Sequence, residues 1–417
     1  MTPIKNGSES ILESSRLLAW AIILGCVILI VDTFIKVPYL GAGGVVVDFD
    51  AFYIAGQMVW AGDVAQAYSA KFMAAAQNRL SNMPIFMPWT YPPFFDLLVA
   101  AFPLASRGVS YVLFISSTFL AYILVIRCLS GGNFTAVLLA TMPALIITIR
   151  IGQNGFLTGT LAGLFCLAFQ NKRAVAGVPL GFMLIKPHLS LGMLVLVTVS
   201  RRWKTLAVTA CVAILSSGLA TLVFGLEVWP AFLAGAKQAS GFLERGIYPL
   251  HRMTSIYAAL HSFGTLPAIA IAVQIFSALI ACGTIVYVRL RGWPTQRVLG
   301  ITILATLAIS PYNYDYDMAI LGVGLALLSR DILENSRPIE KLGLLVFAWL
   351  TCGWGLLLQN RYGGSAPKEF LAPEHQISLG GIGYVLLLGL ILVVLKRLPI
   401  NSVAISNGTK LDVSGAG

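Results

Sequence analysis

Apolar residues occur along the chain in long unbroken runs separated by short polar stretches. Because the runs show little alternation of apolar and polar residues, they exclude an outer-membrane β-barrel. Thirteen segments can be distinguished, at 17–35, 93–105, 109–129, 134–149, 155–169, 174–186, 188–200, 205–225, 266–288, 298–311, 315–329, 341–358 and 378–395. This pattern predicts an all-α polytopic membrane protein.

The segment at 93–105 is the weakest candidate for a crossing. It is short, begins at Pro93 and contains Asp96 and Pro103. If it enters and leaves on the outer side as a re-entrant segment, about twelve crossings remain and both termini are cytoplasmic. The cytoplasmic segments then carry 17 Lys and Arg against 6 Asp and Glu, which accounts for the whole net charge of +11. That bias is what the positive-inside rule expects.

The composition agrees with this topology and narrows the function classes. Hydrophobic residues make up 58% of the 417 residues and charged residues 11%, which excludes a soluble core and a disordered chain. Since the predicted topology explains the positive net charge, the excess of Lys and Arg over Asp and Glu does not indicate a nucleic-acid partner.

The six cysteines lack the paired spacing of a metal site or disulfide framework and are expected to be packing residues. No Walker loop, Rossmann fingerprint, zinc-type spacing or nucleophile elbow is present, so we expect no cofactor and no metal.

One membrane domain is expected over 17–395, between cytoplasmic tails at 1–16 and 396–417. The first apolar run is expected to stay as an anchor, because no small-residue cleavage pattern follows it. Two long outer loops, at 36–92 and 226–265, are predicted outside the crossings.

The first outer loop contains an amphipathic stretch, Phe52–Trp60, and a polar helix-like stretch, Ala65–Leu80. Both suit short helices that lie along the membrane surface. Several crossings are short, since a helix of 15 residues rises only about 22 Å against a hydrocarbon core of about 30 Å. Short helices are tolerated where their ends line a protein-walled cavity, so we expect a cavity that opens outward.

Two carboxylates stand at the start of the first outer loop's helical stretch. Asp48 and Asp50 follow a glycine-rich run and precede Phe52. If Asp50 is the helix N-cap, Asp48 is available to project into the cavity, where a carboxylate can act as a general base. The alternative is that both carboxylates only cap the helix or are solvated.

Further polar groups fall on the outer side of the predicted crossings. Gln153 and Asn154 lie between two apolar helices beside Arg150, which either binds an anionic ligand or extends to the membrane surface. Lys186 and His188 flank Pro187 at an outer turn. They are either parts of a simple hairpin turn or a pair that neutralises phosphate charge.

A second polar turn follows Ser310-Pro311 and contains three acceptor side chains, Asn313, Asp315 and Asp317, interleaved with tyrosines. Such residues are either solvated or suited to sugar hydroxyls, which favour carboxylate acceptors and flat apolar rings. Gly155, Gly159 and Gly163 recur every four residues, a spacing that favours close helix packing. The four histidines are too scattered to indicate a metal site.

An ordered set of short motifs resembles glycosyltransferase family 87. The first-loop part of the set is Asp48-Phe49, Phe52-Tyr53, Ala55-Gly56, Gly62-Asp63, Tyr68, Tyr91-Pro92-Pro93 and Pro103-Leu104. The later part is Gly152-Gln153-Asn154, Lys186-Pro187, Arg201-Arg202-Trp203, Ser310-Pro311 and Tyr316-Asp317, so the resemblance covers roughly residues 40–330. Ser69 and His188 depart from the residues that this family commonly has at those places, and Asp50 leaves the identity of the base open.

The resemblance implies the GT-C architecture, a bundle of about twelve transmembrane helices. It also implies a mannosyltransferase-like enzyme of the bacterial inner membrane, with its active site on the outer side. Such an enzyme takes a hexosyl group, here expected to be mannosyl, from a polyprenyl-phosphate sugar donor to a lipid or glycan acceptor. The first-loop aspartate, Asp48 in this sequence, corresponds to the base in that family.

We therefore predict an inverting transfer, in which one carboxylate suffices, because a retaining double displacement needs a second, nucleophilic acid. The assigned residues are Asp48 as base with Asp50 as the alternate; Arg150, Lys186, His188 and Arg252 for the phosphate; and Tyr53, Tyr91, Gln153, Asn154, Asn313 and Asp317 for donor and acceptor. The alternative functions are a transporter or flippase for a polar lipid or sugar, and a non-catalytic subunit of a polysaccharide assembly complex.

Overall fold

The protein is a bundle of helices in a computed structural model that describes residues 7–40, 48–81, 87–362 and 377–399. The described residues form no β-strand, and an isolated bridge joins Met253 to Tyr314. The helices are α1 (Gly7–Leu40), α2 (Asp48–Trp60), α3 (Val64–Ala67), α4 (Ala70–Ser81), α5 (Pro93–Val99), α6 (Arg107–Ser130), α7 (Phe134–Ile151), α8 (Gly155–Gln170), α9 (Gly177–Phe182), α10 (Leu191–Val199), α11 (Trp203–Phe224), α12 (Val228–Glu244), α13 (Ile256–Ser262), α14 (Pro267–Leu290), α15 (Thr295–Ile309), α16 (Ala319–Asn335), α17 (Pro338–Tyr362) and α18 (Gly380–Leu395). Short 3-10 turns connect several of them, among them η1 (Phe102–Leu104), η4 (Met183–Ile185), η5 (Pro187–Leu189), η6 (Leu250–Arg252) and η7 (Asp315–Met318).

The predicted apolar segments all lie on helical elements, which confirms the all-α fold of a membrane protein. Within the described ranges, five helical stretches are long and apolar enough to cross a membrane: Glu13–Lys36, Arg107–Ile151, Trp203–Phe224, Pro267–Leu290 and Pro338–Arg361. The shorter apolar stretches include Pro93–Leu104, which is broken into α5 and η1. The count of twelve crossings and the re-entrant path of 93–105 stay predictions.

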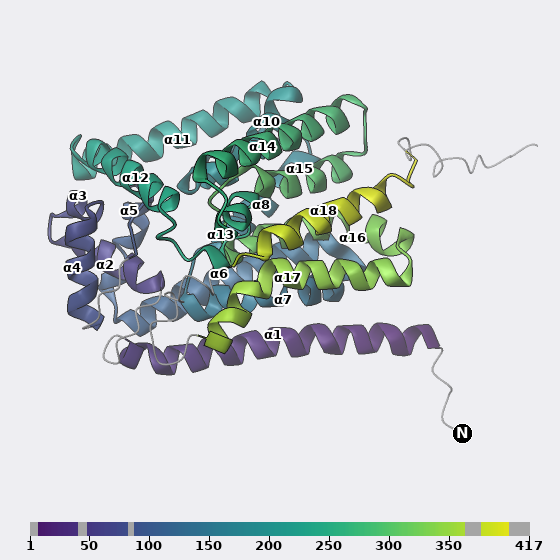
Figure 1. The fold of residues 1–417 in the computed structure, drawn as a ribbon, viewed down its shortest axis with the longest axis horizontal. Coiled ribbons are helices and arrows are strands. Elements are labelled where there is room, and N and C mark those ends of the chain that lie inside the picture. The colour runs from purple at the N-terminus through teal and green to yellow at the C-terminus, as the bar shows by residue number, and fades with distance from the viewer. Residues whose placement is uncertain (1–6, 41–47, 82–86, 363–376, 400–417) are drawn as a thin grey trace, which may run out of the picture.

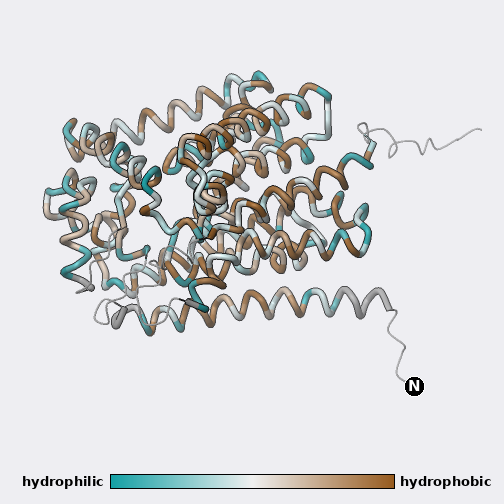
Figure 2. The backbone as a smooth tube through the Cα atoms, in the orientation of Figure 1, coloured by the Kyte–Doolittle hydropathy of each residue, from teal (hydrophilic) through white to brown (hydrophobic). Residues whose placement is uncertain are grey.

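The long helices lie side by side, and the outer-loop helices gather at one end of the bundle. Figure 1 shows α2, α3, α4 and α12 together at that end, whereas the start of α1 and the end of α18 lie at the opposite end. Hydrophobic residues follow the long helices, and hydrophilic residues are concentrated at the two ends (Figure 2). The start of α1 and the end of α18 thus share one end of the bundle, and α2, α3, α4 and α12 share the other. Which end faces the cytoplasm stays a prediction.

The core is centred on α15 and α16, whose residues are buried on nearly every side. Such helices are hydrophobic all round because neighbours surround them. α16 packs against α6, α7, α8 and α15. The Tyr122 hydroxyl of α6 donates to the Ala319 carbonyl at the start of α16, at 2.9 Å. This buried contact fixes the position of the turn that precedes α16.

The glycine repeat of α8 is a packing surface, as the sequence predicts. A Cβ at Gly159 would stand 2.8 Å from the Tyr122 ring, and one at Gly163 would overlap Val125 of α6. A Cβ at Gly155 would overlap the backbone carbonyl of Tyr316. Small residues therefore let α8 approach α6 and the η7 turn closely.

Gly155→Ala is expected to lower the melting temperature of the protein in detergent. The added methyl group meets backbone rather than a flexible side chain, and such overpacking typically costs about 1–3 kcal/mol. Gly218→Ala on α11 is the matched control, because a Cβ there has no other atom within 4 Å. Equal melting temperatures for the two variants would show that α8 has room to move away from η7.

The first outer loop differs from its prediction at two points. α2 begins at Asp48, so Asp50 lies inside the first turn and is not the residue that precedes the helix. The Asp50 carboxylate accepts from Arg107 at 3.2 Å and is 1% exposed. Phe49 and Phe52 are buried among other aromatic rings, so the start of α2 is inserted into the bundle rather than lying on its surface. The polar stretch 65–80 is divided between α3 and α4.

The six cysteines are free thiols, all within the described ranges. Cys26, Cys166 and Cys352 are buried, as expected of packing residues. Cys128 and Cys211 are exposed, so for these two the expectation is wrong: they lie on outward faces of α6 and α11.

Candidate active site

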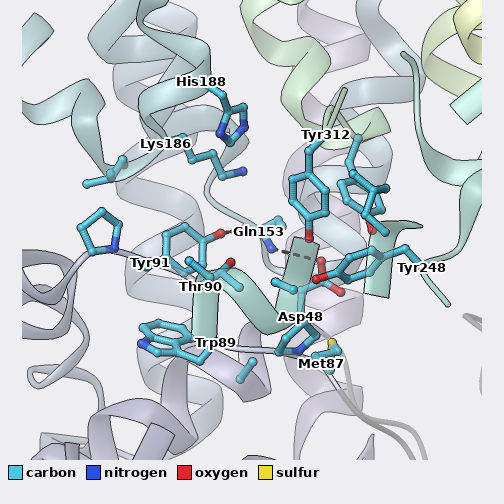
Figure 3. A pocket seen from close by; sticks show the side chains of 18 of the residues that line it. Asp48, Met87, Trp89, Thr90, Tyr91, Gln153, Lys186, His188, Tyr248 and Tyr312 are labelled. Carbon is cyan, nitrogen blue, oxygen red and sulfur yellow. Dashed lines mark hydrogen bonds between the residues drawn. The ribbon is translucent and has the colours of Figure 1, made fainter. Parts of the chain in front are cut away.

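A cavity of about 390 Å³ lies where the outer-loop helices meet the bundle. Its walls come from α2, the segment 87–92, the turn after α7, the η4–η5 turn, α12, the segment 248–252 and the tyrosines around η7. Figure 3 shows Lys186 and His188 at one end of the cavity and Asp48 toward the other, with Gln153 between them. Stretches far apart in sequence thus supply one polar site.

Asp48 reaches this cavity from the first turn of α2 and is 8% exposed. Its Oδ2 accepts from Gln153 Nε2 at 3.1 Å. Gln153 Oε1 in turn accepts from the Tyr91 hydroxyl at 3.1 Å and from the Asn154 backbone N–H at 2.8 Å. Because two donors already occupy the oxygen of this amide, its NH₂ group must face Asp48. The bonds orient the carboxylate and leave its Oδ1 directed toward Arg252, at 4.0 Å.

One arginine and one lysine of the described part of the chain, Arg252 and Lys186, line the cavity. Arg252 donates to Asp315 through Nε at 3.3 Å and Nη2 at 3.1 Å. Lys186 Nζ donates to Asp317 at 2.6 Å. Since buried cations require counter-charges, Asp315 and Asp317 hold these two groups in place.

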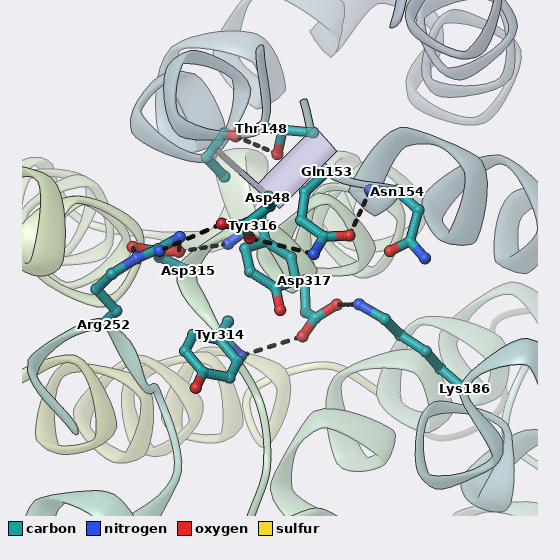
Figure 4. Close-up of polar contacts among 11 residues, drawn as sticks. Asp48, Thr148, Gln153, Asn154, Lys186, Arg252, Tyr314, Asp315, Tyr316 and Asp317 are labelled. Atoms are coloured by element: carbon teal, nitrogen blue, oxygen red, sulfur yellow. Dashed lines mark hydrogen bonds and ion pairs between the residues drawn. The ribbon is translucent and has the colours of Figure 1, made fainter. Parts of the chain in front are cut away.

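The Tyr316 ring stands between the two cations. Lys186 Nζ lies 4.6 Å from the ring centre and Arg252 Cζ lies 5.7 Å from it. Figure 4 shows the two side chains on opposite sides of Tyr316 and Asp317, with Asp48 nearer to Arg252. The site therefore has one side with Asp48 and Arg252 and a second cationic side with Lys186.

The segment 87–92 forms a fixed wall of the cavity. Gln77 of α4 bonds both the N–H and the C=O of Met87, at 2.7 and 2.8 Å. The Trp89 indole donates to Asp96 at 2.9 Å, and the Tyr68 hydroxyl donates to Asp96 at 2.7 Å. Sequence reasoning missed this function of Asp96, Trp89 and Gln77; the signal available was a buried acid inside an apolar segment just after Tyr91-Pro92-Pro93.

The model of glycosyltransferase family 87 matches residues 89–311, more than half of the chain. The chain belongs to glycosyltransferase family 87. No curated protein and no solved structure matches it. The resemblance noted in the sequence is thereby confirmed.

The family 87 match covers only part of the site. It includes the wall segment 89–92, Gln153, Lys186 and Arg252, and it ends before the η7 acids. Residues 48–68, which carry Asp48, precede the matched region. The family membership thus supports a membrane glycosyltransferase, while the geometry alone brings Asp48 to the cavity.

The structure brings together six of the residues that the sequence predicts for the active site: Asp48, Tyr91, Gln153, Lys186, His188 and Arg252 all line the cavity. Asp317 does not line the cavity itself, but its carboxylate accepts a hydrogen bond from Lys186, which does. Asn154 is fully buried beside Gln153, and its backbone rather than its side chain bonds the Gln153 amide.

Other assigned residues lie apart from the cavity lining. Arg150 donates to Asn360 at 3.4 Å, and Tyr53 donates to the Ala105 carbonyl at 3.1 Å. The Asn313 amide bonds the Leu307 carbonyl. Asp50 pairs with Arg107 instead of facing the cavity. In the described ranges, no group of three His, Cys, Asp or Glu side chains is placed to hold a metal ion.

His251 should make the family 87 protein sensitive to acid. Burial and the neighbouring Arg252 lower the pKa of His251 to about 3, against about 6.5 in an unfolded chain. As the pH falls below about 6.5, the unfolded state binds a proton first, so folding stability decreases by about 1.4 kcal/mol per pH unit until the folded pKa is approached. Above that pH neither state is protonated and the effect is absent.

The measurement is the melting temperature of wild type and of His251→Gln at pH 7.5 and pH 5. The wild type should lose more degrees than the variant between these two pH values. Identical losses would show that the buried imidazole does not carry the acid sensitivity.

Proposed function

We propose that the protein transfers a hexosyl group, mannosyl by family resemblance, from a polyprenyl monophosphate to a hydroxyl of a lipid or glycan acceptor, with inversion at the anomeric carbon. The observation that carries the proposal is the placement of Asp48: an oriented carboxylate in a cavity whose far end holds Lys186. One carboxylate beside the acceptor and one cation beside the leaving phosphate are the groups that an inverting transfer requires.

In the proposed reaction, Asp48 accepts the proton of the acceptor hydroxyl as the acceptor oxygen bonds to the anomeric carbon. The bond from that carbon to the phosphate oxygen breaks, and polyprenyl phosphate leaves with one more negative charge than it had in the donor. Gln153 keeps the carboxylate in the orientation for proton transfer, because its amide is itself held by Tyr91. Asp48 later releases its proton to solvent.

Lys186 is the group best placed to stabilise the leaving phosphate. An ammonium group has three N–H donors, and Asp317 accepts one of them, so two remain for phosphate oxygens. Stabilisation that grows with the departing charge lowers the barrier more than it tightens donor binding. His188, two residues further along, presents a ring whose Nε2 has no hydrogen-bond partner among the described residues.

The donor tail would leave the cavity beside Lys186. Ile185 and Pro187, the neighbours of Lys186 in the chain, give the cavity lining an apolar surface there, and Phe232 and Ala236 of α12 extend the apolar lining. A polyprenyl chain joined to a phosphate at Lys186 would follow this surface into the bilayer, since burial of its methylene groups is favourable. The site must then lie in the membrane, because the polyprenyl tail of the donor stays in the bilayer.

The same placement supports an outward-facing site in a bacterial-type inner membrane, with both termini cytoplasmic. The cavity lies at the end of the bundle opposite the start of α1 and the end of α18 (Figure 1). A transporter would instead be expected to hold its ionisable residues near the bilayer midplane.

The test is transfer by the purified protein in liposomes, supplied with radiolabelled polyprenyl-phosphate mannose and a set of lipid and glycan acceptors. Labelled product with an inverted anomeric configuration is the expected result. Movement of the labelled lipid across vesicles without product would support a flippase, and neither product nor movement would support a non-catalytic subunit. Either of these two results would overturn the proposal.

A further inference from the structure

Asp96 is a buried acid that takes no part in the proposed reaction. It lies in α5, shortly after Tyr91-Pro92-Pro93, and is 0% exposed. Among the described residues, no Lys, Arg or His side chain forms an ion pair with it. An ionised carboxylate that is buried without a cation is strongly unfavourable. The position of Asp96 therefore raises the question of its protonation state.

The surroundings of Asp96 are aromatic and apolar. α5 packs against α2, α11 and α12. The Trp89 ring, whose indole N–H donates to Asp96, packs against Phe52 of α2 and Phe95 of α5. Rings of this kind keep water away and supply no charge, so they do not stabilise an ionised carboxylate.

The charged side chains on the helices around α5 do not compensate Asp96. Asp48 of α2 accepts from Gln153. Asp50 of α2 pairs with Arg107. The remaining titratable side chains of these helices are exposed or bonded elsewhere: Tyr53, Lys204, Cys211, Lys237 and Glu244. On the described helices around it, Asp96 thus has no counter-charge.

Two short contacts converge on the Tyr68 hydroxyl. Its oxygen lies 2.9 Å from the Tyr91 carbonyl oxygen and 2.7 Å from Oδ2 of Asp96. A tyrosine hydroxyl has one proton, so it can donate to one of these two oxygens. A carbonyl oxygen has no proton to give. The contact with Asp96 joins two side-chain oxygens, and either of them can carry the proton.

Protonation of Asp96 satisfies every group in this cluster. If Asp96 is ionised, the single proton of Tyr68 leaves either Oδ2 or the Tyr91 carbonyl without a donor. If Asp96 is protonated, its O–H donates to the Tyr68 oxygen, and Tyr68 donates to the Tyr91 carbonyl. Trp89 Nε1 donates to Oδ1 at 2.9 Å in both cases. Because buried polar groups are costly when unpaired, the protonated form is favoured.

This cluster is connected to the cavity by hydrogen bonds. Tyr91 is held at both ends, because its carbonyl accepts from Tyr68 and its hydroxyl donates to Gln153 Oε1 at 3.1 Å. Gln153 in turn donates to Asp48 at 3.1 Å. A chain of contacts thus extends from Asp96 in α5 to the proposed base.

We infer that Asp96 of the folded protein is a protonated carboxylic acid that donates to Tyr68, and that it is a positioning residue for the Asp48 carboxylate. The positioning role rests on the proposed function, whereas the protonation of Asp96 does not. Loss of the proton would break the chain of hydrogen bonds at Tyr68 and loosen the wall that carries Tyr91.

The first experiment detects the proton directly by infrared spectroscopy of the purified protein in detergent at pH 6. The carbonyl band of a carboxylic acid, which a carboxylate lacks, should appear in the difference spectrum of wild type minus Asp96→Asn. Asp50→Asn is the matched control, because Asp50 is also buried but pairs with Arg107, and its difference spectrum should lack the band. Absence of the band from the Asp96→Asn difference spectrum overturns the inference.

The second experiment compares melting temperatures at pH 5 and pH 7. In an unfolded chain an aspartate has a pKa of about 3.9, so it is ionised at both pH values. If Asp96 is protonated in the folded state, folding binds a proton and stability falls as the pH rises. From pH 5 to pH 7 the melting temperature of the wild type should therefore fall relative to that of Asp96→Asn. Both proteins contain His251, so its opposite effect cancels, and a constant difference between them contradicts protonation of Asp96.

The third experiment tests the positioning role through sugar transfer. Asp96→Asn keeps a donor toward Tyr68 and an acceptor toward Trp89, so its kcat at pH 6 should stay within a few-fold of wild type. Asp96→Leu removes both, and displacement of the wall should lower kcat by up to about 100-fold. From pH 6 to pH 9, kcat of the wild type should decrease more than that of Asp96→Asn, because only the wild type can lose the proton.

Parallel pH profiles of the wild type and Asp96→Asn would overturn the positioning role, and this comparison holds even where Asp96→Leu does not fold. If the infrared band is found but the wild type transfers no sugar, the proposed function fails while the protonation of Asp96 stands.

Discussion

Asp48→Asn is expected to lower kcat by about 10²–10⁴, the contribution typical of a positioned general base. The amide can still accept the hydrogen bond that Gln153 Nε2 donates to Asp48 at 3.1 Å, so the cavity should keep its shape. Without a carboxylate, however, no group at that position takes the acceptor proton. Because the phosphate is proposed to bind at the other end of the cavity, donor affinity should stay within a few-fold of wild type.

Asp50→Asn separates the two candidate bases. Asp50 lies in the same turn of α2, is almost fully buried and pairs with Arg107 at 3.2 Å. Loss of that pair should lower the melting temperature while kcat changes only a few-fold. Single-turnover kinetics with radiolabelled donor measure the chemical step in both variants. Near-normal turnover by Asp48→Asn, or a defect that is larger in Asp50→Asn, would remove Asp48 from the mechanism.

Lys186→Met should produce the second large effect. The variant loses the cation that is proposed to stabilise the leaving phosphate, and removal of one such interaction typically lowers the rate by about 10²–10³. It also leaves the Asp317 carboxylate without its partner at 2.6 Å, and an unpaired buried charge is destabilising. The single substitution therefore combines a catalytic effect with a structural one.

The double variant Lys186→Met/Asp317→Asn distinguishes these effects. It removes both charges, so stability should recover toward wild type while the rate of sugar transfer stays low. If the activity also recovers, Lys186 serves only to neutralise Asp317. Arg150→Met is the control for loss of a cation outside the cavity: Arg150 bonds Asn360 and does not line the cavity, so its removal should leave kcat unchanged.

Arg150 and Lys186 have similar surroundings in the sequence but different positions in the structure. Both are cations beside apolar segments, and the sequence predicts a phosphate contact for both. Only Lys186 lines the cavity, because the η4–η5 turn directs it there, whereas Arg150 at the end of α7 bonds α17. The direction of a side chain at a helix end depends on the rotation of that helix in the bundle, which hydropathy does not encode.

Sequence alone also does not decide which of the two aspartates of α2, Asp48 or Asp50, faces the cavity. Residues i and i+2 of a helix point to different faces, and in α2 Asp48 accepts from Gln153 whereas Asp50 pairs with Arg107. Which of them faces the cavity depends on where α2 begins and on how it docks. Asp50 does not cap the helix, because α2 already begins at Asp48, two residues before it.

The sequence by itself determined that the chain is helical and membrane-embedded, and it identified the family, because hydropathy and motif order are properties of local stretches. It also indicated close packing at the glycines of α8. Only the tertiary structure decided which side chains share the cavity and that Asp315 and Asp317 balance its cations. These features join residues that lie far apart in the sequence. They depend on how the helices rotate and pack against one another, and local sequence patterns do not encode that packing.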